Sequence, residues 1–303
     1  FAAIYMLVKL PVLGIFILYD CFCAFFSNIA RIGCCKYKRV DGQVILITGA
    51  GGGLGRLLAL RLADRGATLV LWDADEKGLK NTQEQCVKEA NGVVKIYVVD
   101  MLDRSSIARA AEAVKKEVGP VNILINNAAI GISGKLMEMA EENIRKIVDV
   151  NMMAHFWTAR EFLPDMLAKD SGHIVTIASL GGLFVSAEDM IPYCVSKYGA
   201  LAIQEGLENE CESMKKNGVK FTTVCPGYFH SQLQDNPIVV PHLGALSADY
   251  VADSAIDAIL REMRIRLIPR YLYIAYMLKG ILPRRSVSRI IVGLFGPDSP
   301  VIA

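Results

Sequence analysis

Tyr193 and Lys197 are the pair of residues in this sequence best suited to proton transfer. They lie four residues apart in a segment, 193–216, whose pattern predicts a helix, so both side chains project from one face. A free phenol has a pKa of about 10 and is a poor base at neutral pH. A neighbouring ammonium lowers that pKa, which predicts a general acid/base pair. With 11 tyrosines in the chain, this spacing alone does not identify a site.

A glycine-rich segment indicates the binding of a phosphate group. Residues 48–55, Thr-Gly-Ala-Gly-Gly-Gly-Leu-Gly, lie between an apolar run, 44–48, and a predicted helix, 54–64. Glycines allow the backbone to approach a pyrophosphate closely, and the helix N-terminus adds unpaired N–H groups. A merely flexible turn is the alternative, but a strand before it and a helix after it favour a dinucleotide site. The predicted cofactor-binding residues of this turn are Gly49, Gly51, Gly53, Leu54 and Gly55.

Two acidic residues follow predicted strands. Asp73 comes at the end of the strand 68–72, and Asp100 follows the strand 93–99. A carboxylate in the position of Asp73 accepts hydrogen bonds from the hydroxyls of an adenosine ribose and repels a 2′-phosphate. The sequence therefore favours NAD over NADP, with Asp100 directed toward the adenine edge. The alternative for Asp73 is a helix-capping role, since aspartate is a common capping residue.

The elements that must position these residues alternate between strand and helix. Predicted strands cover residues 44–48, 68–72, 93–99, 123–125, 173–178 and 220–225, and predicted helices cover 54–64, 76–90, 105–118, 141–162 and 193–216. Such an alternation implies a parallel sheet covered by helices on both faces. We therefore predict an α/β fold with a doubly wound, Rossmann-like parallel sheet. Ser179 follows the fifth strand, at the carboxyl edge where such sheets bind ligands.

Taken together, these motifs resemble the short-chain dehydrogenase/reductase family over residues 40–269. The family's glycine motif corresponds to Thr48, Gly49, Gly53 and Gly55, and its catalytic set corresponds to Asn151, Ser179, Tyr193 and Lys197. Its Asn-Asn-Ala-Gly motif corresponds to residues 126–129, with Ala129 in place of glycine, and its Pro-Gly turn to Pro226 and Gly227. Ser231 stands where the family commonly has threonine.

The resemblance implies a role for each of these residues. Tyr193 would be the general acid/base for the substrate oxygen, and Ser179 would hydrogen-bond that oxygen. Lys197 would lower the pKa of Tyr193 and hold the nicotinamide ribose. Asn151 would position a water in a proton relay, a role compatible with that of a helix-kink residue. The other implied contacts to the cofactor come from Asn127, Pro226 and Ser231.

The N-terminal segment has the composition of a membrane anchor. Of the first 30 residues, 24 are apolar, and Lys9 and Asp20 are the only charged ones. A basic cluster follows within residues 31–39, which is typical of an anchor with its flank in the cytosol. A signal peptide and a buried core helix are the alternatives, and the anchor either spans the bilayer or lies in one leaflet. We therefore divide the chain into an anchor with its basic flank, 1–39, a catalytic domain, 40–270, and a tail, 271–303.

The composition excludes several classes of protein. The 303 residues are 53% hydrophobic and 21% charged, with a net charge of +2, which argues against disorder and against nucleic-acid binding. The 8 cysteines and 4 histidines show no metal-ligand spacing, so we expect no metal and a reducing compartment. The tail interleaves arginines with aromatic and aliphatic residues, which suits either a membrane surface or a core strand followed by a solvated helix.

The anchor and the complete catalytic set resemble the membrane-associated branch of the family, which holds retinol dehydrogenases and lipid-droplet 17-beta-hydroxysteroid dehydrogenases. This implies an NAD-dependent dehydrogenase of a retinoid, steroid or other lipid alcohol, on the endoplasmic reticulum membrane or a lipid droplet, with its catalytic domain in the cytosol. The family also implies homodimers formed through the helices after strands four and five. Two alternatives stay open, an NADPH-dependent lipid ketone reductase and a non-catalytic, NAD-binding surface protein.

Overall fold

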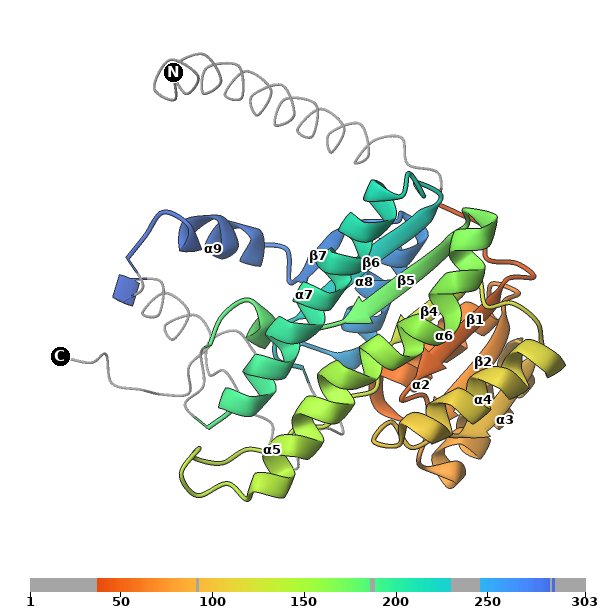
Figure 1. Ribbon diagram of the computed structural model, residues 1–303, viewed down its shortest axis with the longest axis horizontal. Helices are drawn as coiled ribbons and strands as arrows, with labels where there is room; N and C mark the ends of the chain where they lie inside the picture. The colour runs from red at the N-terminus through yellow and green to blue at the C-terminus, as the bar shows by residue number, and fades with distance from the viewer. Residues whose placement is uncertain (1–36, 91–92, 186–188, 230–245, 284, 287–303) are drawn as a thin grey trace, which may run out of the picture. The chain divides into compact units, whose positions relative to one another are not determined.

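One seven-stranded parallel sheet is the centre of the computed structural model, which describes residues 37–90, 93–185, 189–229, 246–283 and 285–286 (Figure 1). The strands are β1 (Val44–Thr48), β2 (Thr68–Asp73), β3 (Val94–Val98), β4 (Ile123–Asn126), β5 (Gly172–Ile177), β6 (Val219–Pro226) and β7 (Ile265–Ile268). Their order is β3-β2-β1-β4-β5-β6-β7. Every residue of β4 is buried, as expected for a strand with helices on both sides. The predicted doubly wound sheet is confirmed.

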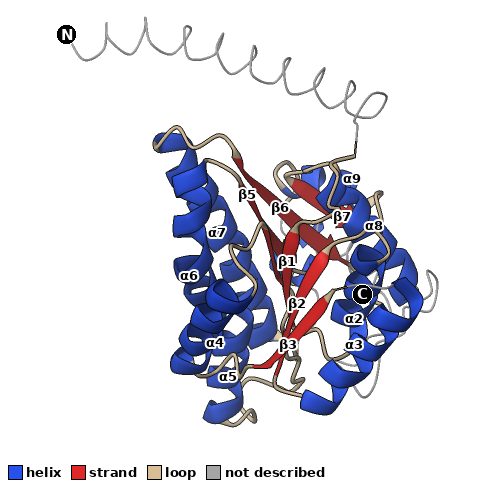
Figure 2. Cartoon of the chain, turned by 90° about the vertical axis from the view of Figure 1, so that its right-hand side faces the viewer, coloured by secondary structure: helices blue, strands red, loops and turns tan. Residues whose placement is uncertain are grey.

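Helices cover both faces of this sheet (Figure 2). They are α2 (Gly53–Ala63), α3 (Glu76–Ala90), α4 (Arg104–Glu117), α5 (Glu141–Val148), α6 (Ala154–Lys169), α7 (Ile191–Ser213), α8 (Ala248–Leu260) and α9 (Leu272–Lys279). Apolar side chains of α2, α3 and α8 pack in one core cluster with the sheet, and those of α4, α6 and α7 pack in a second. The two clusters lie on opposite faces because alternate strand residues point to opposite sides.

The strand order reverses between β1 and β4. The chain moves outward from β1 to β2 and β3, then returns to place β4 on the other side of β1. Ile47 of β1 stands beside Ile125 of β4, so the segments that follow these two strands leave the sheet next to each other. Ligands of doubly wound folds bind at such a reversal, beyond the carboxyl ends of the strands.

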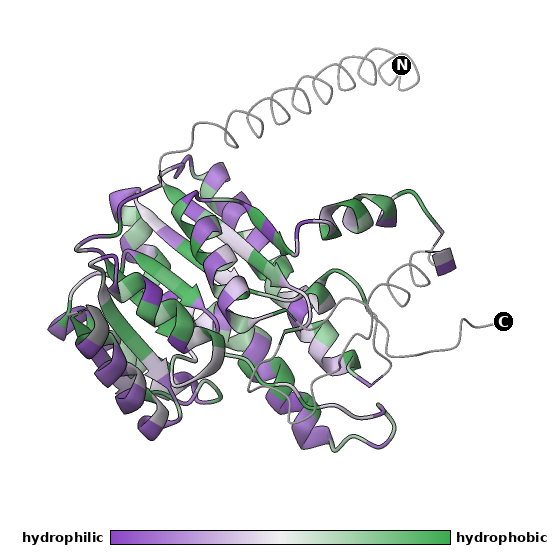
Figure 3. Cartoon of the chain, turned by 180° about the vertical axis from the view of Figure 1, so that it is seen from behind, coloured by the Kyte–Doolittle hydropathy of each residue, from purple (hydrophilic) through white to green (hydrophobic). Residues whose placement is uncertain are grey.

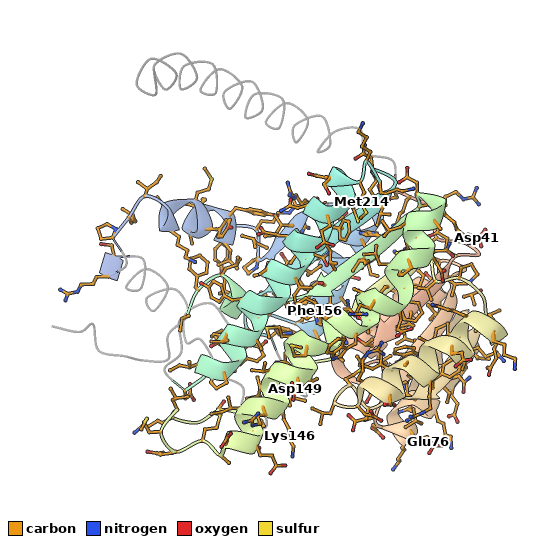
Figure 4. All side chains as sticks on the ribbon, viewed as in Figure 1. Asp41, Glu76, Lys146, Asp149, Phe156 and Met214 are labelled. Carbon is orange, nitrogen blue, oxygen red and sulfur yellow. The ribbon has the colours of Figure 1, made fainter. Side chains whose placement is uncertain are left out.

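The helix predicted over residues 141–162 contains a wider turn. Helix α5 continues into a π-helical turn, Asp149–Met153, and then into α6, which extends to Lys169. Figure 4 labels Asp149, the first residue of the π turn, and Phe156, which lies in α6 beyond it. A π turn adds a residue to the helix and is frequently found at functional sites. This one contains Asn151.

The predicted anchor, residues 1–30, lies outside the described residues, as does most of its basic flank. Among the helices that the structure describes, none combines the length and apolarity needed to cross a bilayer. Downstream, the chain adds β7 to the sheet edge beside β6, followed by the short helix α9. Most of α9 is coloured as apolar in Figure 3.

Candidate active site

A cavity of about 480 Å³ opens at the carboxyl ends of the central strands. This is within the usual size range of small-molecule and cofactor pockets, roughly 300–1,000 Å³. Its walls come from the loops after β1, β2, β4, β5 and β6 and from the first turns of α7. Predicted site residues in the lining are Gly49, Gly51, Gly53, Leu54, Gly55, Asp73, Asn127, Ser179, Tyr193, Lys197 and Pro226. The fold therefore brings most of the predicted site together.

The glycine turn has no room for a side chain at Gly49 or at Gly55. A Cβ added to Gly55 would lie 2.1 Å from the carbonyl oxygen of Gly49, and one added to Gly49, at φ +68°, would lie 2.7 Å from Cα of Ala128. The turn leads directly into the N-terminus of α2, whose N-cap, Gly52, offers no side chain to the free N–H groups. A bare backbone at a helix N-terminus suits a pyrophosphate, so this turn fits a dinucleotide.

Thr48 and Asn127 hold the turn against the loop after β4. The Thr48 hydroxyl accepts hydrogen bonds from the backbone N–H groups of Asn127 and Ala128, both at 3.0 Å. The Asn127 amide in return donates to the carbonyl oxygens of Thr48, at 2.9 Å, and Gly49, at 3.1 Å. These bonds fix the two loops that flank the reversal of strand order.

Asp73 lies at one end of the cavity, and Asp100 does not line it. The Asp73 carboxylate accepts the N–H groups of Gly51 at 2.8 Å and Asp75 at 3.0 Å. Asp75 also lines the cavity, a contribution that the sequence analysis did not assign. Asp100 is exposed, and its carboxylate accepts the N–H of Leu102 at 2.9 Å. Its geometry is that of a turn residue.

Tyr193, Ser179 and Lys197 form a compact group in the opposite part of the lining. The hydroxyls of Tyr193 and Ser179 are hydrogen-bonded to each other. The Lys197 ammonium lies 5.7 Å from the centre of the Tyr193 ring and donates to the carbonyl oxygen of Ile177 at 3.0 Å. Lys197 is 1% exposed. These three side chains supply a phenol, a hydroxyl and a cation around one point of the cavity wall.

Burial, and not the neighbouring lysine, dominates the acidity of this group. It raises the pKa of Tyr193 to about 12, and the hydrogen bond from Ser179 offsets part of that rise. It also lowers the pKa of Lys197 to about 8. Lys197 is not among the groups that shift the pKa of this phenol, and its ammonium donates to the Ile177 carbonyl. Burial thus shifts the protonation equilibria of both side chains toward their neutral forms.

Asn151 is fully buried and does not line the cavity. Its amide exchanges two hydrogen bonds with the backbone of Ile130, at 2.8 and 2.9 Å, and donates to the Ser196 hydroxyl at 3.2 Å. Ser196 donates to the carbonyl oxygen of Tyr193 at 2.7 Å. The side chain of Asn151 therefore ties the loop after β4 to the turn of α7 that carries Tyr193. Ser231, the remaining predicted residue, lies outside the described residues.

A doubly wound sheet, a glycine turn at a helix N-terminus and a tyrosine–lysine–serine group in one cavity define a nicotinamide-dependent oxidoreductase. The short chain dehydrogenase family model matches residues 43–237. The chain belongs to the short-chain dehydrogenase family.

Individual relatives agree with this membership. The chain is 38% identical to 17-beta-hydroxysteroid dehydrogenase 13 of Rattus norvegicus over 255 residues, 84% of each protein. It is 40% identical to epidermal retinol dehydrogenase 2 of Mus musculus over 254 residues, 82% of this chain and 81% of the relative. Among solved structures, a short-chain dehydrogenase/reductase from Burkholderia phymatum in complex with NAD superposes with a TM-score of 0.72 at 26% identity, covering 87% of this chain and 99% of that one.

Proposed function

We propose that this protein is an NAD-dependent dehydrogenase that oxidises a lipophilic alcohol. The observation that carries the cofactor preference is the pair of carboxylates, Asp73 and Asp75, in the cavity lining. Among the described residues of that lining, Lys197 is the only one with a basic side chain, and it belongs to the tyrosine group. A 2′-phosphate near Asp73 would meet negative charge and no cation, whereas ribose hydroxyls would find acceptors.

Initial rates with NAD and NADP test the cofactor preference. We expect kcat/KM to be at least about tenfold higher with NAD than with NADP. Asp73→Ala should reduce this preference, because it removes a hydrogen-bond acceptor for the ribose and a charge that repels the 2′-phosphate. A strong preference of the wild-type enzyme for NADPH would instead support the alternative, a lipid ketone reductase.

In the proposed reaction, the phenolate form of Tyr193 takes the proton of the substrate hydroxyl and Ser179 hydrogen-bonds the same oxygen. NAD, when bound, accepts the hydride from the carbinol carbon. Lys197 supplies positive charge beside the phenol. Asn151 holds α7 against the loop after β4, and in this proposal it also positions a water that relays protons.

Replacing the phenol hydroxyl tests this assignment. Tyr193→Phe should lower kcat by roughly a hundredfold or more, as expected for loss of a general base. Tyr97→Phe is the matched control, because Tyr97 also carries a phenol whose pKa is raised to about 12, and it donates to Glu117 at 2.9 Å outside the cavity. Equal activity of the two variants would refute the catalytic role and favour a non-catalytic NAD-binding protein.

The substrate class is supported by the relatives and by the lining. The two relatives above are named for steroid and retinol substrates. The cavity lining also includes the apolar side chains of Ile130, Leu180, Met190 and Phe229. A panel of retinols, sterols, long-chain alcohols and polar sugar alcohols, assayed with NAD in detergent micelles, tests the class. Preferential turnover of the sugar alcohols would contradict it.

We further propose that residues 1–39 anchor the protein to the endoplasmic reticulum or to lipid droplets, with the catalytic domain in the cytosol. The apolar run and its basic flank support this proposal. Fluorescence microscopy of the full chain should show membrane or droplet localisation, and the charged variant Ile15→Arg/Leu18→Arg should disperse it. An unchanged distribution of the variant would contradict the anchor.

Helix α9 supports a second membrane contact. Ile274 and Met277 of α9, and Ile281 just after its end, are 65%, 72% and 77% exposed. Arg270 and Arg285, on either side, are exposed and suit anionic headgroups. Hydrogen exchange of the full chain should show α9 protected on anionic nanodiscs but not on neutral ones. The same protection in Ile274→Glu/Met277→Glu would refute the contact.

Self-association through α6 and α7 is also part of the proposal. Phe156 on α6 is 40% exposed and Val195 on α7 is 54% exposed, so both helices carry apolar surface. Light scattering during gel filtration should report a dimer, and Phe156→Glu/Val195→Glu should report a monomer. A monomeric wild type would remove this part of the proposal.

A further inference from the structure

A guanidinium lies directly behind the glycine turn, and the proposed reaction does not use it. Arg56, in the first turn of α2, is half-buried. Its Nε donates to the hydroxyl of Thr82 on α3 at 2.9 Å, and its Nη2 donates to the carbonyl oxygen of Gly51. Gly51 contributes to the cavity lining and Arg56 does not. The cation is therefore held on the far side of the Gly51 backbone.

Thr82 holds this arrangement in place. Its side chain is fully buried, and its hydroxyl reaches the carbonyl oxygens of Ala50 at 2.9 Å and Gly78 at 3.0 Å. Because the same hydroxyl accepts from Arg56, one threonine connects α2, α3 and the glycine turn. The contact between α3 and the turn is tight, since a Cβ added to Gly78 would lie 2.5 Å from the carbonyl oxygen of Gly51.

On the cavity side, Gly51 donates its N–H to the Asp73 carboxylate at 2.8 Å. A single residue's backbone thus separates the guanidinium of Arg56 from the carboxylate that meets the adenosine ribose. Guanidinium groups bind phosphates through paired, charge-assisted hydrogen bonds that a neutral carbonyl cannot match. Arg56 therefore has the chemistry of a phosphate ligand and lies one backbone residue away from Asp73, but it donates hydrogen bonds to Thr82 and to the Gly51 carbonyl.

We propose that Thr82 determines cofactor specificity together with Asp73. The Thr82 hydroxyl keeps Arg56 bound to the protein, so a 2′-phosphate meets Asp73 and Asp75 alone. Loss of the hydroxyl leaves Arg56, among the residues that the structure describes, with the Gly51 carbonyl as its hydrogen-bond acceptor, and loss of the Asp73 charge opens the way to a phosphate. Both changes are needed for Arg56 to turn toward NADPH. This inference rests on the proposed preference for NAD.

Binding of reduced cofactors to the full-length protein tests the inference without a lipid substrate. The dissociation constants of NADH and NADPH are measured by nicotinamide fluorescence for wild type, Asp73→Ser, Thr82→Val and the double variant. We expect the double variant to bind NADPH at least about tenfold more tightly than Asp73→Ser does, because it gains a charge-assisted phosphate contact. Thr82→Val alone should gain little, since both carboxylates remain.

Two further variants identify the group responsible. Thr82→Ser keeps the hydroxyl and, combined with Asp73→Ser, should give no gain in NADPH affinity. Arg56→Gln, added to Asp73→Ser/Thr82→Val, should abolish the gain in NADPH affinity. Added to Asp73→Ser alone, it should change NADPH affinity by less than about twofold. This second comparison also tests the proposal if Thr82→Val does not fold.

The outcomes separate the two proposals. Equal NADPH affinity of Asp73→Ser with and without Thr82→Val would overturn the role of Thr82, while an intact NAD preference of the wild type would leave the proposed function standing. A wild type that binds NADPH more tightly than NADH would instead overturn the NAD preference itself, and the inference with it.

Discussion

Acid should destabilise this protein through one buried imidazole. His155, at the start of α6, is 3% exposed, and neither of its ring nitrogens has a hydrogen-bond partner among the described residues. Burial, and secondarily the positive charge of Lys197, lowers the pKa of His155 from 6.5 to about 3. The unfolded chain therefore takes up a proton at a pH where the native protein does not. Because the unfolded state binds more protons, the stability of the native state falls as the pH drops from about 6.5 toward about 3.

The size of this effect follows from the shift. Each pKa unit corresponds to about 1.4 kcal/mol, so between pH 7 and pH 5 this single group should lower the free energy of unfolding by roughly 2 kcal/mol. Substitution by leucine, His155→Leu, removes the titrating group and two unpartnered nitrogens. We therefore expect the variant to lose roughly 2 kcal/mol less than wild type over this pH interval. At pH 7 it should be at least as stable, because unsatisfied buried polar groups are costly.

Urea unfolding followed by circular dichroism, at pH 7 and pH 5 and constant ionic strength, measures the difference. Carboxylates titrate in both proteins, so their contribution cancels in the comparison. His173→Leu is a control for the loss of a buried histidine, because His173 is hydrogen-bonded to the Thr222 hydroxyl at 2.8 Å and its removal should destabilise the protein already at pH 7. Identical losses of stability for wild type and His155→Leu between the two pH values would refute the reasoning.

Three further predictions concern the cavity and its supports. Gly55→Ala, whose Cβ would lie 2.1 Å from the Gly49 carbonyl oxygen, should lower the unfolding free energy by roughly 1–3 kcal/mol and weaken NAD binding, as thermal melts and fluorescence titration would report. Asn151→Leu should cost roughly 2–4 kcal/mol in urea unfolding, because it removes three hydrogen bonds, two of them to the half-buried backbone of Ile130, and an unchanged midpoint would contradict this. Ser179→Ala removes a hydrogen bond that lowers the pKa of Tyr193, so the rise of kcat with pH during alcohol oxidation should move to higher pH than in wild type.

The sequence predicts the parts of the fold that depend on local pattern. The apolar run at 44–48 and the helical periodicity at 76–90 recur in the structure with the same bounds as β1 and α3. The reason is that a buried parallel strand needs a short run of apolar residues, whereas an amphipathic helix needs apolar residues that recur with the helical period. The predicted glycines and Tyr193 line one cavity because each follows a strand or opens a helix at the carboxyl edge.

What the sequence does not predict depends on contacts between distant segments. Asn151 bonds to Ile130 across 21 residues, and only the folded chain brings the two together inside a π turn. The bond between Arg56 and Thr82 joins two helices across 26 residues in the same way. For Asp100, its place after a strand suggested the cofactor, but a local turn uses its carboxylate instead.

The electrostatics of the tyrosine group do not set the direction of the reaction. With a pKa raised to about 12, Tyr193 is protonated at neutral pH and so stands ready as an acid, the form that ketone reduction requires. Oxidation requires the phenolate, which the hydrogen bond from Ser179 and rising pH both favour. The local chemistry thus permits both directions, and the preference for oxidation in the proposed function comes from elsewhere. In the proposed function it rests on the carboxylates Asp73 and Asp75 of the cavity lining, whose negative charge would favour NAD, and hence the oxidised pool, over NADP.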